Sequence, residues 1–303
     1  MVASVFLLAI ATSCTKDDPD NGNNTSDNGS GWNTSFPEKK VKSVKYDMAG
    51  FPFTYEFYWN GDRLNRISCS TQYGVINSMY FNYDGQGRIS KTAFQMDDDE
   101  VVDAYTYTYD ANGRLIKQEI QVPCYEEYNP ATDEYVTVYK PSTYTFTYTN
   151  ENVSKIHHEY YYYKYYGDGG LQKEEVDYLC TWTDGNLTLI RKKYDDGDDE
   201  SYTLQYDNKK NPLRFPMGVE VIIPLLLDDI EDTDVVDGDY SYMMALFYAF
   251  GGAGVNNWTS FSIEDTPYLI KTYTYDSDGY PQSGTYSGSF GEESQPITFT
   301  FTY

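Results

Sequence analysis

Apolar and polar residues alternate along much of this 303-residue chain, which is the period of a β-strand. The clearest example is YTYTYDANGRLIKQEI at 105–120. Its tyrosines at 105, 107 and 109 share one face of a strand, and the intervening threonines share the other. Asp110 to Gly113 has the composition of a tight turn, because Asn and Gly tolerate positive φ. Leu115 then begins a return strand, so the stretch predicts a hairpin.

This hairpin pattern recurs along the chain. Alternating aromatic residues, a polar turn and a return strand that starts with Leu, Ile or Val also occur at 55–67, 79–91, 144–156, 180–192, 202–214 and 271–281. Trp59, Tyr83 and Tyr109 are spaced by 24 and 26 residues, which is typical of an antiparallel meander. The next interval, to Tyr148, is 39 residues and predicts a longer hairpin or loop around Asn129-Pro130.

The predicted fold is all-β: an antiparallel up-and-down meander of repeated hairpins that forms a barrel or strongly curved sheet. The chain ends in PITFTFTY, another alternating strand that could close the sheet. One segment departs from the pattern. Residues 241–250 are apolar nearly all round and precede Gly251-Gly252, so we predict one short helix near 241–250, with a short core strand as the alternative.

The N-terminal region predicts an exported protein. Residues 2–11 are apolar, too few to cross a bilayer as a mature helix, and Ala-Thr-Ser then precedes Cys14. This resembles a bacterial lipobox and implies lipidation of Cys14, although no Lys or Arg precedes the apolar run. A buried N-terminal strand is the alternative. We therefore expect a lipoprotein signal peptide over 1–13, a flexible tether over 14–40 and a single β-repeat domain over 41–303.

Composition narrows the classes of partner. The net charge of −25 argues against nucleic-acid binding and against adsorption to anionic lipid, so the lipid anchor is the only membrane contact we expect. Acidic loops at 97–100 and 195–200 could bind calcium weakly, although neither has the EF-hand spacing and solvated turns are favoured. Cys69, Cys124 and Cys180 allow one disulfide at most, and small buried apolar residues are favoured.

No catalytic, cofactor or metal motif is evident, and the chain is not expected to be an enzyme. His157 and His158 are adjacent and face opposite sides of a strand, so they cannot chelate one metal together. In HHEYYYYKYYGDGG at 157–170, outward His157, Tyr161 and Tyr163 could stack on sugar rings or on a partner protein. A second layer packed over them is the alternative. Trp258 is a weaker candidate of the same kind.

Two family resemblances bear on these expectations. Tyr-Asp-x-x-Gly-Arg followed by Ile or Leu, at 83–89 and 109–115, resembles the YD repeats of Rhs-type proteins. The lipobox with Lys16-Asp17-Asp18, the segment 206–212 and the later 255–257 resemble a family of Bacteroidota lipoproteins of unknown function with a porin-like fold. This resemblance implies a barrel or half-barrel and no activity. Lys16-Asp17-Asp18 also resembles the export signal of Bacteroidota surface lipoproteins, which implies an outer-membrane protein facing the cell exterior.

The return strands carry charges at mid-strand: Arg66, Lys91, Lys117 and Glu119. A membrane-spanning barrel needs an apolar outer band, so a soluble barrel is favoured over a pore. The predicted function is that of a lipid-anchored cell-surface module that binds a glycan or an envelope partner. A structural envelope protein without a small ligand and a glycoside hydrolase with a carboxylate pair are the alternatives.

Overall fold

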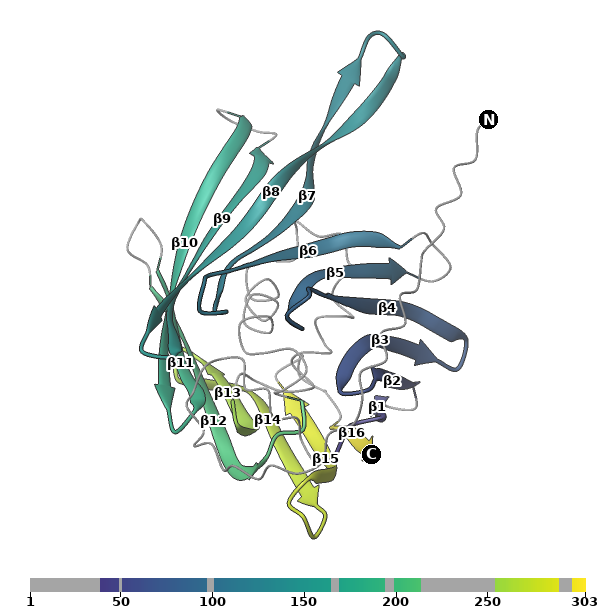
Figure 1. Cartoon of the computed structure of the whole chain (residues 1–303), viewed down its shortest axis with the longest axis vertical. Coiled ribbons are helices and arrows are strands. Elements are labelled where there is room, and N and C mark those ends of the chain that lie inside the picture. The colour runs from purple at the N-terminus through teal and green to yellow at the C-terminus, as the bar shows by residue number, and fades with distance from the viewer. Residues whose placement is uncertain are drawn as a thin grey trace.

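The computed structural model describes residues 39–48, 51–96, 101–164, 169–193, 199–213, 254–288 and 296–303, and these form a closed sixteen-stranded antiparallel barrel (Figure 1). Each strand pairs with its neighbours in the sequence, and the first strand also pairs with the last. The strands are β1 Ser43–Met48, β2 Phe51–Asn60, β3 Arg63–Thr71, β4 Gly74–Tyr83, β5 Ile89–Met96, β6 Val102–Tyr109, β7 Leu115–Asn129, β8 Glu134–Thr149, β9 Asn152–Lys164, β10 Gly170–Thr183, β11 Asn186–Lys193, β12 Glu200–Lys210, β13 Asn256–Ile263, β14 Thr266–Tyr275, β15 Pro281–Gly288 and β16 Ile297–Thr302.

The barrel confirms the predicted up-and-down meander and decides between a barrel and an open sheet. Closure is made by β1 and β16, whose register runs from Ser43↔Thr302 to Asp47↔Thr298. The segment 241–250, for which a short helix is predicted, lies outside the described residues, as do the signal peptide and most of the tether. All regular structure within the described ranges is β-strand, so no helix there could cross a membrane.

The repeated sequence pattern corresponds to a repeated turn. In the β4–β5 hairpin, Asp84 Oδ1 accepts the backbone N–H groups of Gln86 and Arg88, both at 2.9 Å. Its other oxygen accepts Arg88 Nε at 2.7 Å, and Gly87 takes the positive φ of 83° that the turn requires. Asp110 and Asp276 accept the two corresponding backbone N–H groups in their own hairpins. This accounts for the Asp and the Gly of the repeat.

In six hairpins, the aromatic residue before the repeated turn links the hairpin to the previous one. The Tyr83 hydroxyl donates to the Leu64 carbonyl at 2.7 Å, so each ring ties its strand to the start of an earlier return strand. Other tyrosine hydroxyls donate in the same way to a backbone carbonyl: Tyr109 to Ile89, Tyr148 to Leu115 and Tyr206 to Leu187. The indole N–H groups of two tryptophans make the equivalent bonds, Trp59 to Val41 and Trp182 to Val153. The Arg after the turn also stacks on the next ring: Arg88 Cζ lies 4.5 Å from the Tyr109 centroid. The motif therefore holds successive hairpins in one register.

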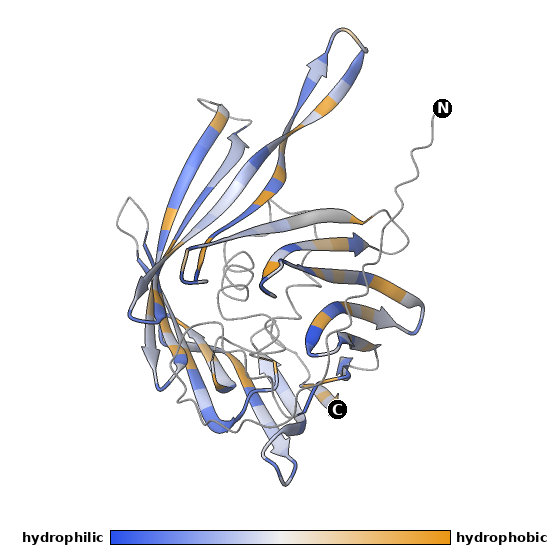
Figure 2. Cartoon of the chain, viewed as in Figure 1, coloured by the Kyte–Doolittle hydropathy of each residue, from blue (hydrophilic) through white to orange (hydrophobic). Residues whose placement is uncertain are grey.

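The two faces of the barrel wall differ in polarity. On β8, Tyr144 and Phe146 are 0% and 4% exposed, while the alternating Thr145 and Thr147 are exposed. Because the convex side of a closed barrel is open to solvent, the buried positions are the inward ones. They form one apolar core that runs from Val44 in β1 to Phe299 in β16. Figure 2 shows the resulting mixture of hydrophilic and hydrophobic residues along the strands.

Candidate binding surfaces and a candidate metal centre

The three candidates on β9 point outward, as their alternation predicts. His157, Tyr161 and Tyr163 are each half-buried, so they are less exposed than a free stacking platform would be. The Tyr163 ring packs on Tyr125 of β7, with centroids 4.9 Å apart. The Tyr161 hydroxyl points to Glu159 Oε1 at 3.5 Å, the limit of a weak hydrogen bond. Part of this row is therefore covered by β7 rather than open to a ligand.

Trp258 is not an exposed aromatic residue, and the expectation that it offers an open stacking platform is wrong. It lies on the inward face of β13, where it is 2% exposed. The Lys271 ammonium lies 4.0 Å from its ring centroid, and the Lys271 side chain is itself buried. Burial lowers the pKa of Lys271 well below its usual value. Trp258 thus belongs to the core and to the environment of a buried lysine.

Charged side chains form a continuous network on the outward face of β9 and β10, here called the β9–β10 network. Its members are Lys155, His157, Glu159, Lys173, Glu175 and Asp177. The antiparallel register sets His157 directly opposite Asp177 and Glu159 directly opposite Glu175. Alternation puts all six side chains on one side of the hairpin. Opposite charges therefore face each other along the pair of strands.

Within this network, each acid has a basic neighbour. Lys155 Nζ lies 2.6 Å from Asp177 Oδ2, and His157 Nδ1 lies 2.8 Å from Asp177 Oδ1. Lys173 Nζ bridges the facing glutamates, at 2.7 Å from Glu159 Oε2 and 2.5 Å from Glu175 Oε1. The Lys173 ammonium lowers the pKa of Glu175. Hydrogen bonds from Lys155 and His157 lower the pKa of Asp177, although partial burial acts in the opposite direction.

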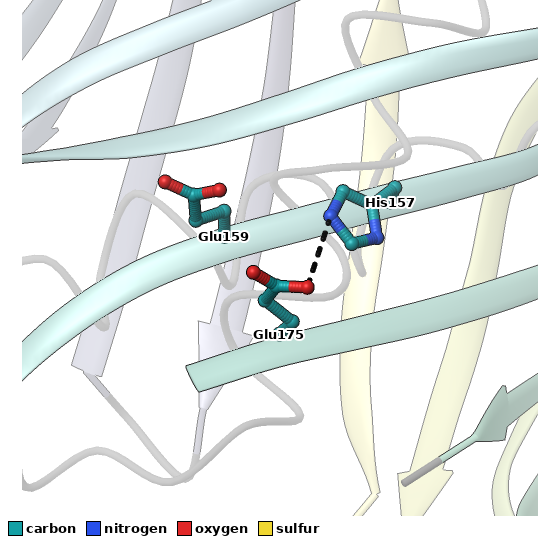
Figure 3. Close-up of side chains that lie close together, drawn as sticks. All are labelled: His157, Glu159 and Glu175. Atoms are coloured by element: carbon teal, nitrogen blue, oxygen red, sulfur yellow. Dashed lines mark ion pairs between the residues drawn. The ribbon is translucent and has the colours of Figure 1, made fainter. Parts of the chain in front are cut away.

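One part of the network could hold a metal ion. His157, Glu159 and Glu175 each offer a ligand atom, and these atoms all lie within 4.8 Å of one another (Figure 3). His157 Nε2 is 3.9 Å from Glu175 Oε2. His157 and His158 cannot share an ion, as their adjacency predicts, because His158 points inward and is 4% exposed. The sequence pattern did not predict the cross-strand partner Glu175, whose position depends on the register of β9 and β10.

The long interval before Tyr148 forms a hairpin that projects from the barrel. β7 and β8 extend together beyond their neighbours (Figure 1), and the turn between them follows Asn129. We call residues 121–141 the β7–β8 arm. Three of its tyrosines, Tyr128, Tyr135 and Tyr139, are 48%, 70% and 57% exposed. The sequence predicted the long hairpin but did not single out these rings, although their alternation in EYVTVYKPS was a signal.

The remaining sequence predictions concern Cys14, the two acidic loops and the three other cysteines. Cys14, the acidic loop at 97–100 and residues 195–198 of the loop at 195–200 lie outside the described residues, so lipidation and weak calcium binding stay predictions. Cys69, Cys124 and Cys180 are free thiols. Only Cys69 is fully buried, and the other two are half-buried, so the expectation that all three are buried is partly wrong. Burial raises the pKa of Cys69 to about 11 and that of Cys180 to about 12, which keeps both thiols protonated and unreactive.

Comparison with known proteins gives only distant matches. No family model and no curated protein matches the chain. A porin-like protein from Bacteroides uniformis is 13% identical with a TM-score of 0.42, over 88% of this chain and 99% of that one. A porin-like protein from Bacteroides vulgatus is 11% identical, with the same TM-score and coverage. These are porin-like Bacteroides neighbours, as the sequence resemblance implied. They are too distant to carry an argument about function.

Proposed function

We propose that this protein is a lipid-anchored barrel of the bacterial outer membrane that stands outside the bilayer and binds another envelope protein through the β7–β8 arm. The observation that carries the proposal is the exposed row of Tyr128, Tyr135 and Tyr139. Large exposed aromatic residues that lie close together are typical of contact surfaces. On this proposal the chain is a binding module, not an enzyme or a pore.

The polarity of the barrel wall supports a position outside the bilayer. Arg66, Lys117 and Glu119 alternate with buried residues on their strands and so lie on the outward face. An outer wall in lipid must be apolar, and one Lys or Arg at the bilayer midplane costs about 2–4 kcal/mol there. The inner wall is mainly aromatic and aliphatic, with a minority of buried polar residues, whereas the lumen of a spanning channel is polar. The two faces are therefore reversed relative to a membrane-spanning barrel.

The arrangement of the arm supports a protein as the partner. Tyr135 and Tyr139 lie on the same face of β8, since alternate residues share a face, and Tyr128 is paired with Tyr135 across the hairpin. The pairing of β7 with β6 extends only to Glu119, and that of β8 with β9 begins at Thr143. Between these points, the arm presents strand edges that no other described strand covers. Such edges can add to a partner's sheet.

The charge of the arm suggests what the partner surface is like. Glu126, Glu127, Asp133 and Glu134 surround the exposed tyrosines, and all four are exposed. A partner patch with apolar contacts and a basic rim complements this composition. A glycan is the alternative, because aromatic rings also stack on sugars.

The arrangement of carboxylates gives no support to the hydrolase alternative. Glu159 and Glu175 face each other, but Lys173 bridges them and lowers the pKa of Glu175. A general acid in glycoside hydrolysis needs a raised pKa.

The test is site-specific photocrosslinking in cells that naturally produce the protein. A photoreactive phenylalanine replaces Tyr135 on the arm in one strain and Tyr73, which is 87% exposed at the β3–β4 turn, in the control strain. The expected result is a defined adduct with one envelope protein from position 135 and none from position 73. A variant with Tyr128→Ser and Tyr139→Ser should lose the adduct.

Two results would contradict this proposal. Equal labelling from both positions would show that the arm is not the contact surface. A glycan-array signal that the arm variant loses, without any protein adduct, would replace the protein partner with a glycan. The anchor is tested separately: Cys14→Ser should prevent incorporation of labelled fatty acid and release the protein from the membrane fraction.

A further inference from the structure

The β9–β10 network contains a set of ligands that nothing in the proposed function uses. We propose that His157, Glu159 and Glu175 form a surface site for a divalent transition-metal ion, with Zn²⁺ as the probe, and that the Lys173 ammonium and the metal are alternative counter-ions for the two glutamates. This proposal is independent of the β7–β8 arm.

The strand geometry puts the three ligands together. His157 and Glu159 are two residues apart on β9, so both point outward, and Glu175 lies opposite Glu159 on β10. Their ligand atoms lie within 4.8 Å of one another, so small side-chain rotations suffice to reach the separation of ligands on one ion. The side chains are 34–46% exposed, which leaves an entry path from solvent. Figure 3 shows the carboxylate of Glu175 facing the imidazole of His157 across the hairpin.

Asp177 orients the imidazole for this role. Its Oδ1 accepts a hydrogen bond from His157 Nδ1 at 2.8 Å, and its other oxygen is held by Lys155 at 2.6 Å. A proton on Nδ1 leaves the lone pair of Nε2 available on the side of Glu175. A histidine that ligates a metal commonly donates its second nitrogen to a carboxylate in this way, which fixes the ring and raises its basicity. This contact is a feature of a metal site that a chance group of acids lacks.

The ligand chemistry selects the class of ion. One imidazole nitrogen and two carboxylate oxygens suit Zn²⁺ and similar first-row ions, whereas Ca²⁺ takes six to eight oxygen ligands. Three protein ligands leave a coordination position for water or for a donor atom from another molecule. The site therefore differs from the calcium sites considered for the acidic loops.

Lys173 decides how strongly the metal binds. Its ammonium lies 2.5 Å and 2.7 Å from the two glutamates, where the metal would bind. The lysine is 40% exposed on a flexible stem, so it can rotate into solvent when an ion replaces it. Because exposed ion pairs contribute little, this competition weakens metal binding without preventing it.

The experiment titrates the full mature chain, without an affinity tag, with Zn²⁺ by calorimetry and with Co²⁺ by absorption spectroscopy. One ion per chain is expected at this site. His157→Ala should abolish it, and Asp177→Asn should weaken it by roughly tenfold or more. Lys173→Met should tighten it by roughly three- to tenfold, which a purely structural ion-pair network would not produce. Glu134→Gln on the arm removes one negative charge, as Asp177→Asn does; it is the control and should leave binding unchanged.

The proposal fails if wild-type and His157→Ala chains bind Zn²⁺ equally, or if Lys173→Met leaves the affinity unchanged. A thiolate-to-cobalt charge-transfer band would place the ion on a cysteine such as Cys124 and would also overturn it. Circular dichroism of each variant checks that the barrel is intact.

Discussion

Tyr273 and Phe299 contact each other edge to face, with ring centroids 5.5 Å apart, although their strands are not neighbours. β15 lies between them, and its residue opposite both is Gly284. Only a residue without a side chain leaves room for the two rings to meet. A Cβ at this position would lie 2.0 Å from the Thr272 carbonyl oxygen and 2.4 Å from Phe299 Cζ. Gly284 therefore allows an aromatic contact between β14 and β16, and β16 is one of the two strands that close the barrel.

Gly284→Ala is therefore expected to destabilise the protein by about 1–3 kcal/mol, because the added methyl group forces backbone or ring to move. Urea unfolding measures the change. Ser287→Ala, an exposed position on the same strand, is the control and should stay within about 0.5 kcal/mol of wild type. Equal effects of the two substitutions would show that the rings do not need this gap.

Removing one aromatic hydroxyl tests the links between hairpins. Tyr83→Phe deletes the donor to the Leu64 carbonyl while the ring keeps its volume. The expected cost is about 1 kcal/mol in the free energy of unfolding, the usual net value of one hydrogen bond. Tyr73→Phe is the matched control on an 87% exposed ring, and no measurable change is expected. If Tyr83→Phe also leaves the free energy of unfolding unchanged, the packing of the ring, and not its hydroxyl, positions the hairpin.

The turn aspartates predict a loss of stability in acid. Slight burial opposes the ionisation of Asp84, but hydrogen bonds from Arg88 and Gln86 outweigh it and lower its pKa. A carboxylate with a lowered pKa in the folded state stabilises that state at pH values above its unfolded pKa of about 3.9. This contribution is lost as the pH falls through the folded pKa. Asp84→Asn should therefore be less stable than wild type at pH 6, and the difference should shrink below pH 4 (thermal unfolding, pH 2–7). A difference independent of pH would mean that charge is not involved.

The buried Lys271 predicts a second rise of stability with pH, in the alkaline range. Its pKa is lowered in the folded protein, while the unfolded chain keeps a lysine pKa of about 10.4. Below about pH 10.4 the Lys271 amine is protonated in the unfolded chain, whereas burial disfavours its protonated form in the folded protein. The buried lysine therefore lowers the free energy of unfolding at neutral pH. Lys271→Met should be more stable than wild type at pH 8, and the gain should shrink towards pH 10.5. If Lys271→Met is destabilised at pH 8, the contact with Trp258 outweighs the burial cost.

The hairpins were predictable because their signals are local. Asp, Gly and the following Arg in 83–89 interact within one turn, and strict alternation placed His157 and Tyr161 correctly on the outward face of β9. The repetition of these hairpins predicted a barrel or a strongly curved sheet, but it could not predict closure, because the pairing of β1 with β16 is not encoded in any single turn.

The position of Trp258 could not be predicted by alternation. The register of β12 and β13 shifts between Gln205 and Tyr206, so that Gln205 pairs with Ser260 and Tyr206 pairs with Trp258. The extra residue, Thr259, lets Trp258 and Phe261 both point inward although they are three positions apart. The grouping of Glu175 with His157 was missed for a related reason, since the two residues meet only through the register of β9 and β10.

The seam between β1 and β16 joins residues 43–47 to residues 298–302, the most distant strands of the chain. Local hairpins can form within microseconds, whereas bringing together ends about 255 residues apart costs roughly 5 kcal/mol of chain entropy. Closure is therefore expected to be the final step of folding, when β16 joins a sheet that has already curled. Until then two strand edges stay open, so the time before closure is when this protein is most exposed to aggregation.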